Sequence, residues 1–140
     1  MSGDLTINND DAYVTYGIVM GDGFLDALGS PSPMKDYIEN VSRLEHGRRI
    51  FSRNTKLDSR ELTLVFNMEG TSISDYQDKK ERFYNLLYSG EDIKISTRRS
   101  AEVFKLKYKN SVGYGEEPSG MFGKISVKFI EPNPTDRSND

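Results

Sequence analysis

Few side chains in this chain of 140 residues are suited to catalysis or metal binding. It has no cysteine, which excludes disulfides, zinc–thiolate sites and thiol nucleophiles. Its one histidine, His46, cannot make a multi-histidine metal site. A histidine base needs an orienting acid and a nucleophile nearby, and no serine lies in a nucleophile-elbow pattern. We therefore interpret His46, in Glu45-His46-Gly47, as a turn or surface residue.

Adjacent acidic residues occur at Asp10-Asp11 and at Glu116-Glu117. A catalytic carboxylate pair needs both groups to face one bond across a defined gap, and neighbours along a strand point to opposite faces. Both pairs are therefore predicted to be solvated surface. Because no nucleophile–base pair or metal-ligand set is present, we expect no enzymatic activity, no metal site and no cofactor.

Glycines gather in residues 110–123, NSVGYGEEPSGMFG. A phosphate cradle needs such a turn to lead into a helix, whereas these glycines stand between two predicted strands. The segment is predicted to be a long, mobile hairpin loop. The alternative is a loop that becomes ordered between subunits on assembly.

Three lysines, Lys105, Lys107 and Lys109, alternate with apolar residues in 102–109, EVFKLKYK. Such a stripe commonly protects a sheet edge from aggregation. The alternative is contact with an acidic partner, such as the first third of another copy, since residues 1–46 hold eight acidic and two basic residues. The net charge of −3 and the pI of 5.3 argue against nucleic-acid binding, and we expect no sequence-specific nucleic acid as partner.

The chain has eight tyrosines and no tryptophan. Tyrosine is enriched at protein interfaces because it buries a large ring while its polar tip stays in water. Some tyrosines are expected in the core and others on a surface that contacts protein. The candidate subunit-interface residues are Tyr13, Tyr16, Lys105, Lys107, Lys109, Tyr114, Met121 and Phe122.

The pattern of apolar residues predicts the elements that position these side chains. Residues 61–69, ELTLVFNME, alternate with period two, as a half-buried strand does. Residues 74–89 have helical spacing, with Ser74 and Gln77 as a capping box and Gly90 as the C′ glycine. Further strands are predicted at 12–20, 48–53, 92–97, 102–109 and 124–130.

This order predicts a β-rich α+β fold, a single-domain β-sandwich or barrel with one flanking α-helix at about 74–89. Residues 12–130 are predicted to form the domain, between polar arms at 1–11 and 131–140. Residues 34–45 are expected to carry one helical turn or to be irregular. No apolar run approaches 18 residues, so no membrane span is expected, and the polar N-terminus has no signal-peptide core.

The order and texture of these segments resemble the hub domain of phage distal tail proteins and the related tail-tube and tail-completion folds. The resemblance runs over about 12–130. It begins with AYVTYGIVM and the proline-broken PSPMKDYIENVSRLEHGRRIF, and continues with ELTLVFNMEG, DYQDKKERFYNLLYSGED, IKIST and VFKLKYKN. The resemblance implies a β-sandwich or barrel with one flanking helix, assembled into a ring around the tail channel, usually a hexamer, with no catalytic residues.

The resemblance also implies the chain's surroundings: other copies of itself and neighbouring tail proteins as partners, assembly in the host cytoplasm, and a place in the virion tail. Many distal tail proteins carry a second, carbohydrate-binding-like domain, for which 140 residues leave no room. We therefore expect a structural ring, as hub, tube or adaptor, rather than a receptor-binding protein. The alternative is a small β-barrel or β-sandwich module that binds carbohydrate or single-stranded nucleic acid, and the absence of tryptophan and the acidic pI count against it.

Overall fold

The computed structural model describes residues 3–33 and 58–138. Its strands form one antiparallel sheet of seven, in the order β2-β1-β5-β6-β7-β4-β3. In chain order the elements are β1 Leu5–Ile7, β2 Asp10–Asp11, α1 Ala12–Tyr16, β3 Ile18–Met20, α2 Phe24–Leu28, β4 Arg60–Glu69, α5 Ile73–Leu87, β5 Ile93–Thr97, β6 Phe104–Glu116 and β7 Phe122–Glu131.

The centre of the sheet is the pairing of β4 with β7, which runs without interruption over ten residue pairs, from Arg60 opposite Glu131 to Glu69 opposite Phe122. Alternate residues of both strands point into the core, as the period-two pattern of 61–69 predicts. The predicted strands at 61–69, 92–97 and 124–130 are confirmed as β4, β5 and β7. The buried apolar residues on β4 and β7 are Leu62, Leu64, Phe66, Met68, Ile125, Val127 and Phe129.

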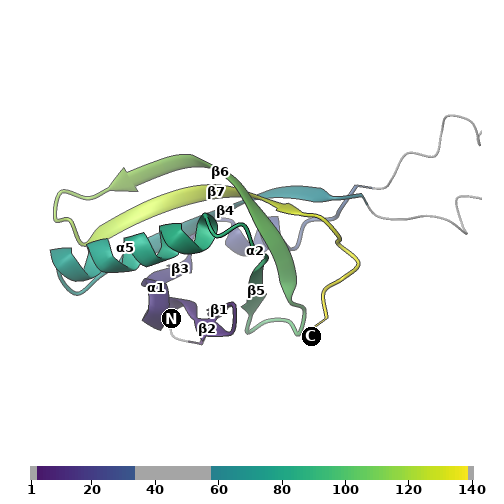
Figure 1. The fold of residues 1–140 in the computed structure, drawn as a ribbon, viewed down its shortest axis with the longest axis horizontal. Coiled ribbons are helices and arrows are strands. Elements are labelled where there is room, and N and C mark those ends of the chain that lie inside the picture. The colour runs from purple at the N-terminus through teal and green to yellow at the C-terminus, as the bar shows by residue number, and fades with distance from the viewer. Residues whose placement is uncertain (1–2, 34–57, 139–140) are drawn as a thin grey trace, which may run out of the picture.

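Helix α5 covers the inner face of this sheet, beneath β6 and β7 in Figure 1. The ring of Phe66 lies at the centre of the core, edge-on to Phe24, Phe83 and Phe129 at centroid distances of 5.3, 5.2 and 6.3 Å. Aromatic pairs of this geometry contribute about 0.5–1.5 kcal/mol each beyond the burial of their area. The predicted β-rich fold with a flanking helix is therefore confirmed.

The start of α5 differs from the prediction. The N-cap is Ser72, not Ser74: its backbone is extended and its Oγ accepts a hydrogen bond from the Asp75 amide at 3.0 Å. Asp75 in turn accepts a hydrogen bond from the Thr71 amide at 2.9 Å, and this bond is the main reason that its pKa is lowered. Tyr88 is the C-cap, so Ser89 takes the C′ position predicted for Gly90, and Gly90, with φ of 81°, lies one residue further on.

The single strand predicted at 12–20 is wrong in its first half. Residues 12–16 form α1 because the Asp11 carboxylate caps the Val14 amide at 3.0 Å and because Ala12 and Tyr16, four residues apart, are both buried. Gly17 then adopts φ of 67°, which ends the helix and redirects the chain into β3. Local capping and burial override the β preference of this segment.

The long loop predicted at 110–123 is also wrong. Strand β6 continues from the predicted 102–109 to Glu116, and β7 begins at Phe122, so only residues 117–121 form the turn. The two glycines in this part of β6, Gly113 and Gly115, pair with Ser126 and Lys124 of β7. Pairing with a long, well-packed neighbour thus keeps a glycine-rich segment in strand conformation.

The segments predicted as arms make ordered contacts where they are described. Leu5 and Ile7 are buried, and β1 pairs with β5. Residues 132–137 turn back across the start of β6, where the Val103 amide donates to the Arg137 carbonyl oxygen at 3.0 Å. The division into a domain and two arms stays a prediction, and the predicted strand at 48–53 and the segment 34–45 lie outside the described residues.

Replacing Ser72 by alanine should destabilise the protein by about 1 kcal/mol, because the Asp75 amide loses its capping partner. Ser74→Ala is the matched control, since Ser74 is exposed and lies within the helix rather than at its cap. Urea denaturation followed by circular dichroism measures both free energies of unfolding. Equal losses for the two variants would contradict the assignment of the cap.

Candidate assembly surface

Strand β6 has an open edge along most of its length. Its first residues pair with β5, but that pairing ends at Leu106 opposite Ile93. From Lys107 to Glu116, β6 pairs with β7 on one side, and no strand within residues 3–33 and 58–138 pairs with the other. An open edge of this kind presents backbone donors and acceptors to which another chain can add a strand.

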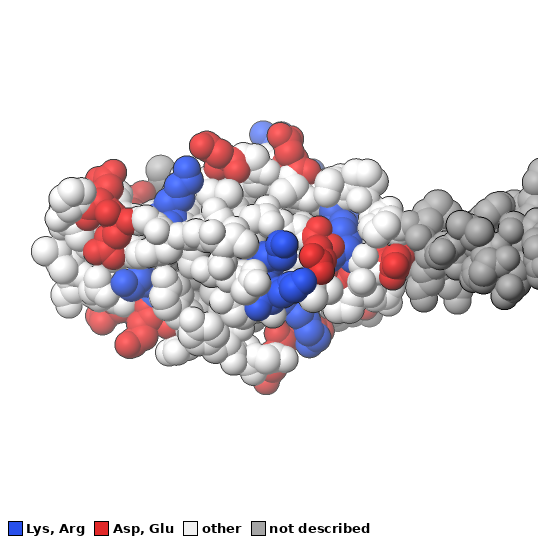
Figure 2. Space-filling model, turned by 90° about the horizontal axis from the view of Figure 1, so that it is seen from above, with Lys and Arg blue, Asp and Glu red and all other residues white. Residues whose placement is uncertain are grey.

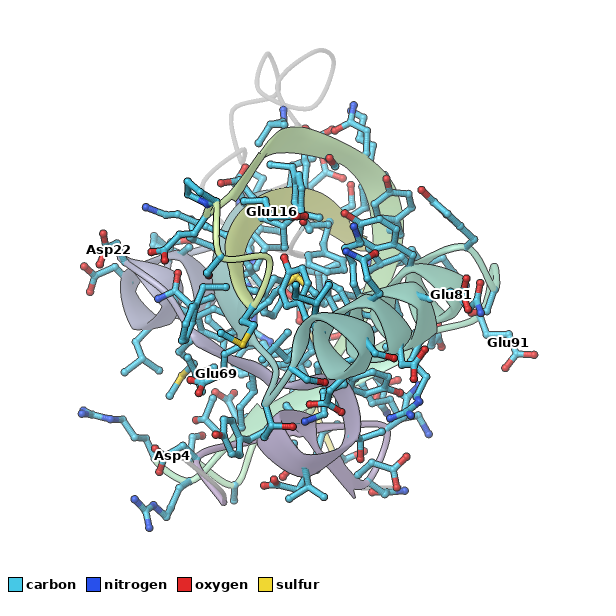
Figure 3. The ribbon with its side chains drawn as sticks, turned by 90° about the vertical axis from the view of Figure 1, so that its left-hand side faces the viewer. Asp4, Asp22, Glu69, Glu81, Glu91 and Glu116 are labelled. Atoms are coloured by element: carbon cyan, nitrogen blue, oxygen red, sulfur yellow. The ribbon has the colours of Figure 1, made fainter. Side chains whose placement is uncertain are left out.

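Two β-bulges shape this open edge. At the first bulge, Tyr108 and Asn110 pair with consecutive residues of β7, so Lys109 between them is an extra residue on β6. At the second, Ser111 and Gly113 do the same, so Val112 is the extra residue. Bulges increase the local twist and bend of a strand, and β6 arches over the sheet in Figures 1 and 3. The side chain of Val112 is 55% exposed on this arch.

A partly exposed hydrogen-bond network fixes the end of the hairpin to α5. The Tyr114 hydroxyl donates to Glu116 Oε1 at 2.6 Å, so the Tyr76 hydroxyl of α5 donates to Tyr114 Oη at 2.8 Å. Lys80 Nζ lies 3.7 Å from the same carboxylate oxygen and 5.4 Å from the centre of the Tyr114 ring. Burial first, and then the hydrogen bonds with Glu116 and Tyr76, raise the pKa of Tyr114, so it remains a hydrogen-bond donor at neutral pH.

The same end of the sheet holds a concave pocket of about 500 Å³, lined by the ends of β4, β6 and β7. Its walls combine acidic side chains with exposed aromatic rings: Tyr114 is 41% exposed and Phe122 40%. In Figure 3, Glu116 lies beneath the arch of β6, whereas Glu81 and Asp22 lie on the two flanks. A Cβ added at Gly113 or Gly115 would meet no atom within 4 Å, so the β6 backbone is uncovered there.

The pocket offers apolar contact from its aromatic rings and polar contact from its acidic side chains. Across residues 3–33 and 58–138, no three or more acidic or histidine side chains are grouped so that they could hold a metal ion. In the same part of the chain, no helix has the length and apolar character of a membrane span. His46 lies outside the described residues.

The structure brings three of the candidate interface residues together at this end. Tyr114, Met121 and Phe122 belong to one hairpin, and the Met121 carbonyl oxygen accepts a hydrogen bond from the Gly70 amide at 2.9 Å. Tyr13 of α1 reaches the pocket wall, because its hydroxyl donates to Glu69 Oε2 at 3.3 Å.

Tyr16 lies in the core instead. It is 7% exposed and packs edge-on against Phe83 at a centroid distance of 6.0 Å. Burial is the main cause that raises the pKa of its hydroxyl. The role of the candidate residues in a subunit interface stays a prediction.

The three lysines of the stripe lie away from the core, and each has a carboxylate partner within the chain. Lys105 pairs with Asp136 at 2.8 Å, and Lys107 pairs with Asp92 at 2.9 Å. Lys109 pairs with Glu61 at 2.9 Å, and this hydrogen bond is the main cause of the lowered pKa of Glu61. Figure 2 shows basic and acidic side chains side by side in the middle of this face, with acidic side chains gathered at the end far from the grey residues.

Sequence reasoning missed Val112 and Ile73 as exposed apolar residues; their exposed fractions are 55% and 60%. The signal for Val112 is present in Val112-Gly113-Tyr114-Gly115, where larger side chains alternate with glycines as in a strand. The sequence holds no signal that Ile73 is exposed, because helical spacing does not tell which other element, if any, packs on the first turn of α5.

The fold is a β-rich domain with one long open strand edge among the described residues. A family model for the phage tail protein RIFT-related domain matches residues 24–130, and the chain belongs to this family. The predicted resemblance to phage distal tail and hub proteins is therefore confirmed, and the chain is a structural component of a phage tail. No curated protein sequence matches the chain.

Among solved structures, the chain is similar in fold to SPP1 Dit (gp 19.1), whose structure is described as a paradigm of the hub adsorption apparatus in phages that infect Gram-positive bacteria. The TM-score is 0.55 at 14% sequence identity, and the match covers 94% of this chain. The chain spans about half of the Dit chain, since the match covers 50% of it.

Replacing Gly123 by alanine should loosen the joint between the hairpin and α5. The added Cβ would overlap the hydroxyl of Tyr76, which is 1% exposed and cannot move aside, and would lie 3.1 Å from the Gly115 carbonyl oxygen. We expect a loss of about 1–3 kcal/mol in the free energy of unfolding, measured by chemical denaturation.

Gly113→Ala is the matched control on the facing strand, and it should change the free energy of unfolding by less than about 0.5 kcal/mol. In a Tyr76→Phe background the cost of Gly123→Ala should fall, because the overlapping oxygen is gone. An unchanged cost in that background would show that the overlap is not the cause.

Proposed function

We propose that this chain is a ring-forming structural component of a phage or prophage tail, acting as hub, tube or adaptor. Membership of the phage tail protein RIFT-related domain family supports a tail role, and the fold shared with a hub protein supports a hub-like position. The partners are further copies of the chain, six by resemblance, together with neighbouring tail proteins. The proposed assembly takes place in the bacterial cytoplasm and the product resides in the virion tail.

The observation that carries this proposal is the open edge of β6 from Lys107 to Glu116. Among the described residues the opposite edge of the β6-β7-β4-β3 portion is β3, so β6 and β3 lie on opposite sides of the same sheet. A contact between unlike edges of neighbouring copies is heterologous, and it closes into a ring when the rotation per copy divides a full turn. We propose that β6 of one copy adds to the β3 side of the next.

Side chains at the hairpin end add apolar area to this proposed contact. Val112, Tyr114 and Phe122 are exposed in the single chain, and burial of such side chains stabilises an interface by about 25 cal/mol per Å². The lysine stripe contributes less to our proposal, because each lysine already has a carboxylate partner within its own chain. To bind one of these lysines, the acidic residues 1–46 of another copy would have to displace the carboxylate that already pairs with it.

A ligand-binding module remains the second candidate, favoured by the pocket with its exposed aromatic rings. A sugar or base stacks on a flat, exposed ring. Outside the pocket, Tyr88 is 66% exposed, but its ring stands at 69° to that of Tyr108, so these two rings do not form one flat platform.

The mass of the wild-type chain in solution, measured by light scattering after size exclusion at low and high salt, tests the proposal. We expect a closed oligomer at both salts, because backbone pairing and apolar contact resist screening. An oligomer that dissociates at high salt would instead assign the contact to the charged surfaces. A compact monomer of 15.9 kDa at both salts would overturn self-assembly, and a change in tyrosine fluorescence on adding oligosaccharide would then support the ligand-binding candidate.

Replacing Val112 by lysine should abolish or weaken the oligomer by at least tenfold in its dissociation constant, because it places a charge on the open edge. Ala101→Lys is the matched control: Ala101 is exposed but lies in the turn between β5 and β6, away from the open part of β6 and from β3. Light scattering over a concentration series measures both. An unchanged mass for Val112→Lys, or an equal loss in both variants, would contradict assembly through β6.

A further inference from the structure

An ion pair is buried at the end of the β4–β7 ladder that lies far from the hairpin. Arg60 and Glu131 are cross-strand neighbours with exposed fractions of 2% and 0%. Arg60 Nε donates to Glu131 Oε1 at 2.9 Å. Burial is the main cause that lowers the pKa of Arg60, and Glu131 opposes it.

A second guanidinium shares the same carboxylate. Arg137 Nε donates to Glu131 Oε2 at 2.8 Å, and Arg137 Nη2 donates to Glu131 Oε1 at 2.9 Å. The hydrogen bond with Glu131 is the main cause that raises the pKa of Arg137. Arg137 also lies over the ring of Phe104 at 4.7 Å, and its carbonyl oxygen accepts from the Val103 amide. The carboxylate therefore holds residues 132–137 against the start of β6.

On its other side, Arg60 reaches the end of α2. Its Nη1 donates to the carbonyl oxygens of Leu28 at 2.9 Å and of Ser30. Close by in the chain, the Asp58 amide donates to the Pro33 carbonyl oxygen at 2.7 Å, which ties together the two described ends next to residues 34–57. One guanidinium thus joins α2, β4 and β7.

The cost of burying these charges indicates that the cluster has a role beyond stability. Replacing a buried ion pair by apolar side chains is often neutral or stabilising, whereas removing one partner leaves an uncompensated charge. Arg60 Nη2 is buried and has no hydrogen-bond partner among the described residues, so the cluster is not optimised for hydrogen bonding alone. Both arginines donate to Glu131 Oε1, so a movement of one guanidinium alters the hydrogen bond of the other.

We propose that Glu131 is a buried joint that couples the segment 132–137 to the end of α2, so that release of Arg137 from Glu131 loosens Leu28–Ser30. Arg137 supplies two of the three guanidinium hydrogen bonds to this carboxylate. Without Arg137 the carboxylate reorients toward Arg60, and Arg60 weakens its bonds to the two carbonyl oxygens. This joint acts within one chain and does not depend on ring assembly.

Amide hydrogen exchange of the full chain carrying Arg137→Met tests the coupling, since methionine keeps the apolar stem over Phe104. The Val103 amide should exchange at least tenfold faster, because its acceptor segment is released. The Gly29 and Ser30 amides, whose acceptors are Leu25 and Ala27, should exchange at least threefold faster as well. The Glu117 amide, bonded to the Phe122 carbonyl oxygen at the far hairpin, should be unchanged.

Glu102→Gln is the matched control, because the Glu102 carboxylate lies 3.6 Å from Arg137 Nη1 and is half exposed. It should leave the exchange of Gly29 and Ser30 unchanged. An Arg137→Met effect confined to Val103 would overturn the coupling, and an equal acceleration of every amide, Glu117 included, would show global destabilisation instead.

A double-mutant cycle gives an independent measure. The double variant Arg60→Met/Arg137→Met should lower the free energy of unfolding by more than the two single variants combined, since only the double variant leaves Glu131 without a guanidinium. Additive effects would mean that the two arginines act separately, which overturns the shared joint. If Arg60→Met does not fold, the exchange experiment on Arg137→Met still tests whether segment 132–137 is coupled to the end of α2.

Discussion

The ten-pair ladder between β4 and β7 is the constraint on which the rest of this structure depends. It places Phe66 opposite Ile125 at the centre of the core, where Phe66 meets α2, α5 and the neighbouring β7. Interiors of proteins are close-packed, so the position of this one ring restricts the elements that touch it. Strands β6 and β3 pair with the two sides of this ladder, and β5, β1 and β2 continue the sheet beyond β6.

The ladder also explains how a long strand edge can stay open without the chain losing its fold. Strand β6 gains its stability from β7 on one side and from the Tyr76–Tyr114 contact with α5 beneath it. It does not require a partner on its outer side. Two bulges twist that side, which limits unspecific pairing while the backbone remains available to a chain of matching shape. The edge thus stays available for the assembly proposed above without being needed for the fold of the single chain.

The two ends of the ladder carry different chemistry. At the hairpin end, glycines and exposed aromatic rings leave room for another chain. At the far end, Arg60 and Glu131 close the core with a buried ion pair that also holds residues 132–137. Between them, the charged outer face is largely paired within the chain, and exposed pairs of this kind contribute about 0–1 kcal/mol each. Specific recognition is therefore expected from shape and backbone pairing more than from surface charge.

The sequence by itself determined the elements whose side chains repeat with a clear period. The alternation in 61–69 and 124–130 predicts the two central strands, and the spacing of Tyr76, Phe83 and Leu87 predicts the long helix. Local pattern was insufficient for α1 and for the second half of β6. There an aspartate cap at Asp11 and pairing with β7 decide the outcome against the local preference.

For the candidate surface, too, some residues could be named from the sequence and others only from the structure. Tyr114, Met121 and Phe122 could be named from residue type, because interfaces favour such side chains. The burial of Tyr16, the ion pairs of the three lysines and the shared carboxylate of Glu131 could not be named in this way. In most of these contacts the partners are 31 to 71 residues apart. Only tertiary structure decides which distant groups meet, since a contact between remote residues depends on the path of all the chain between them.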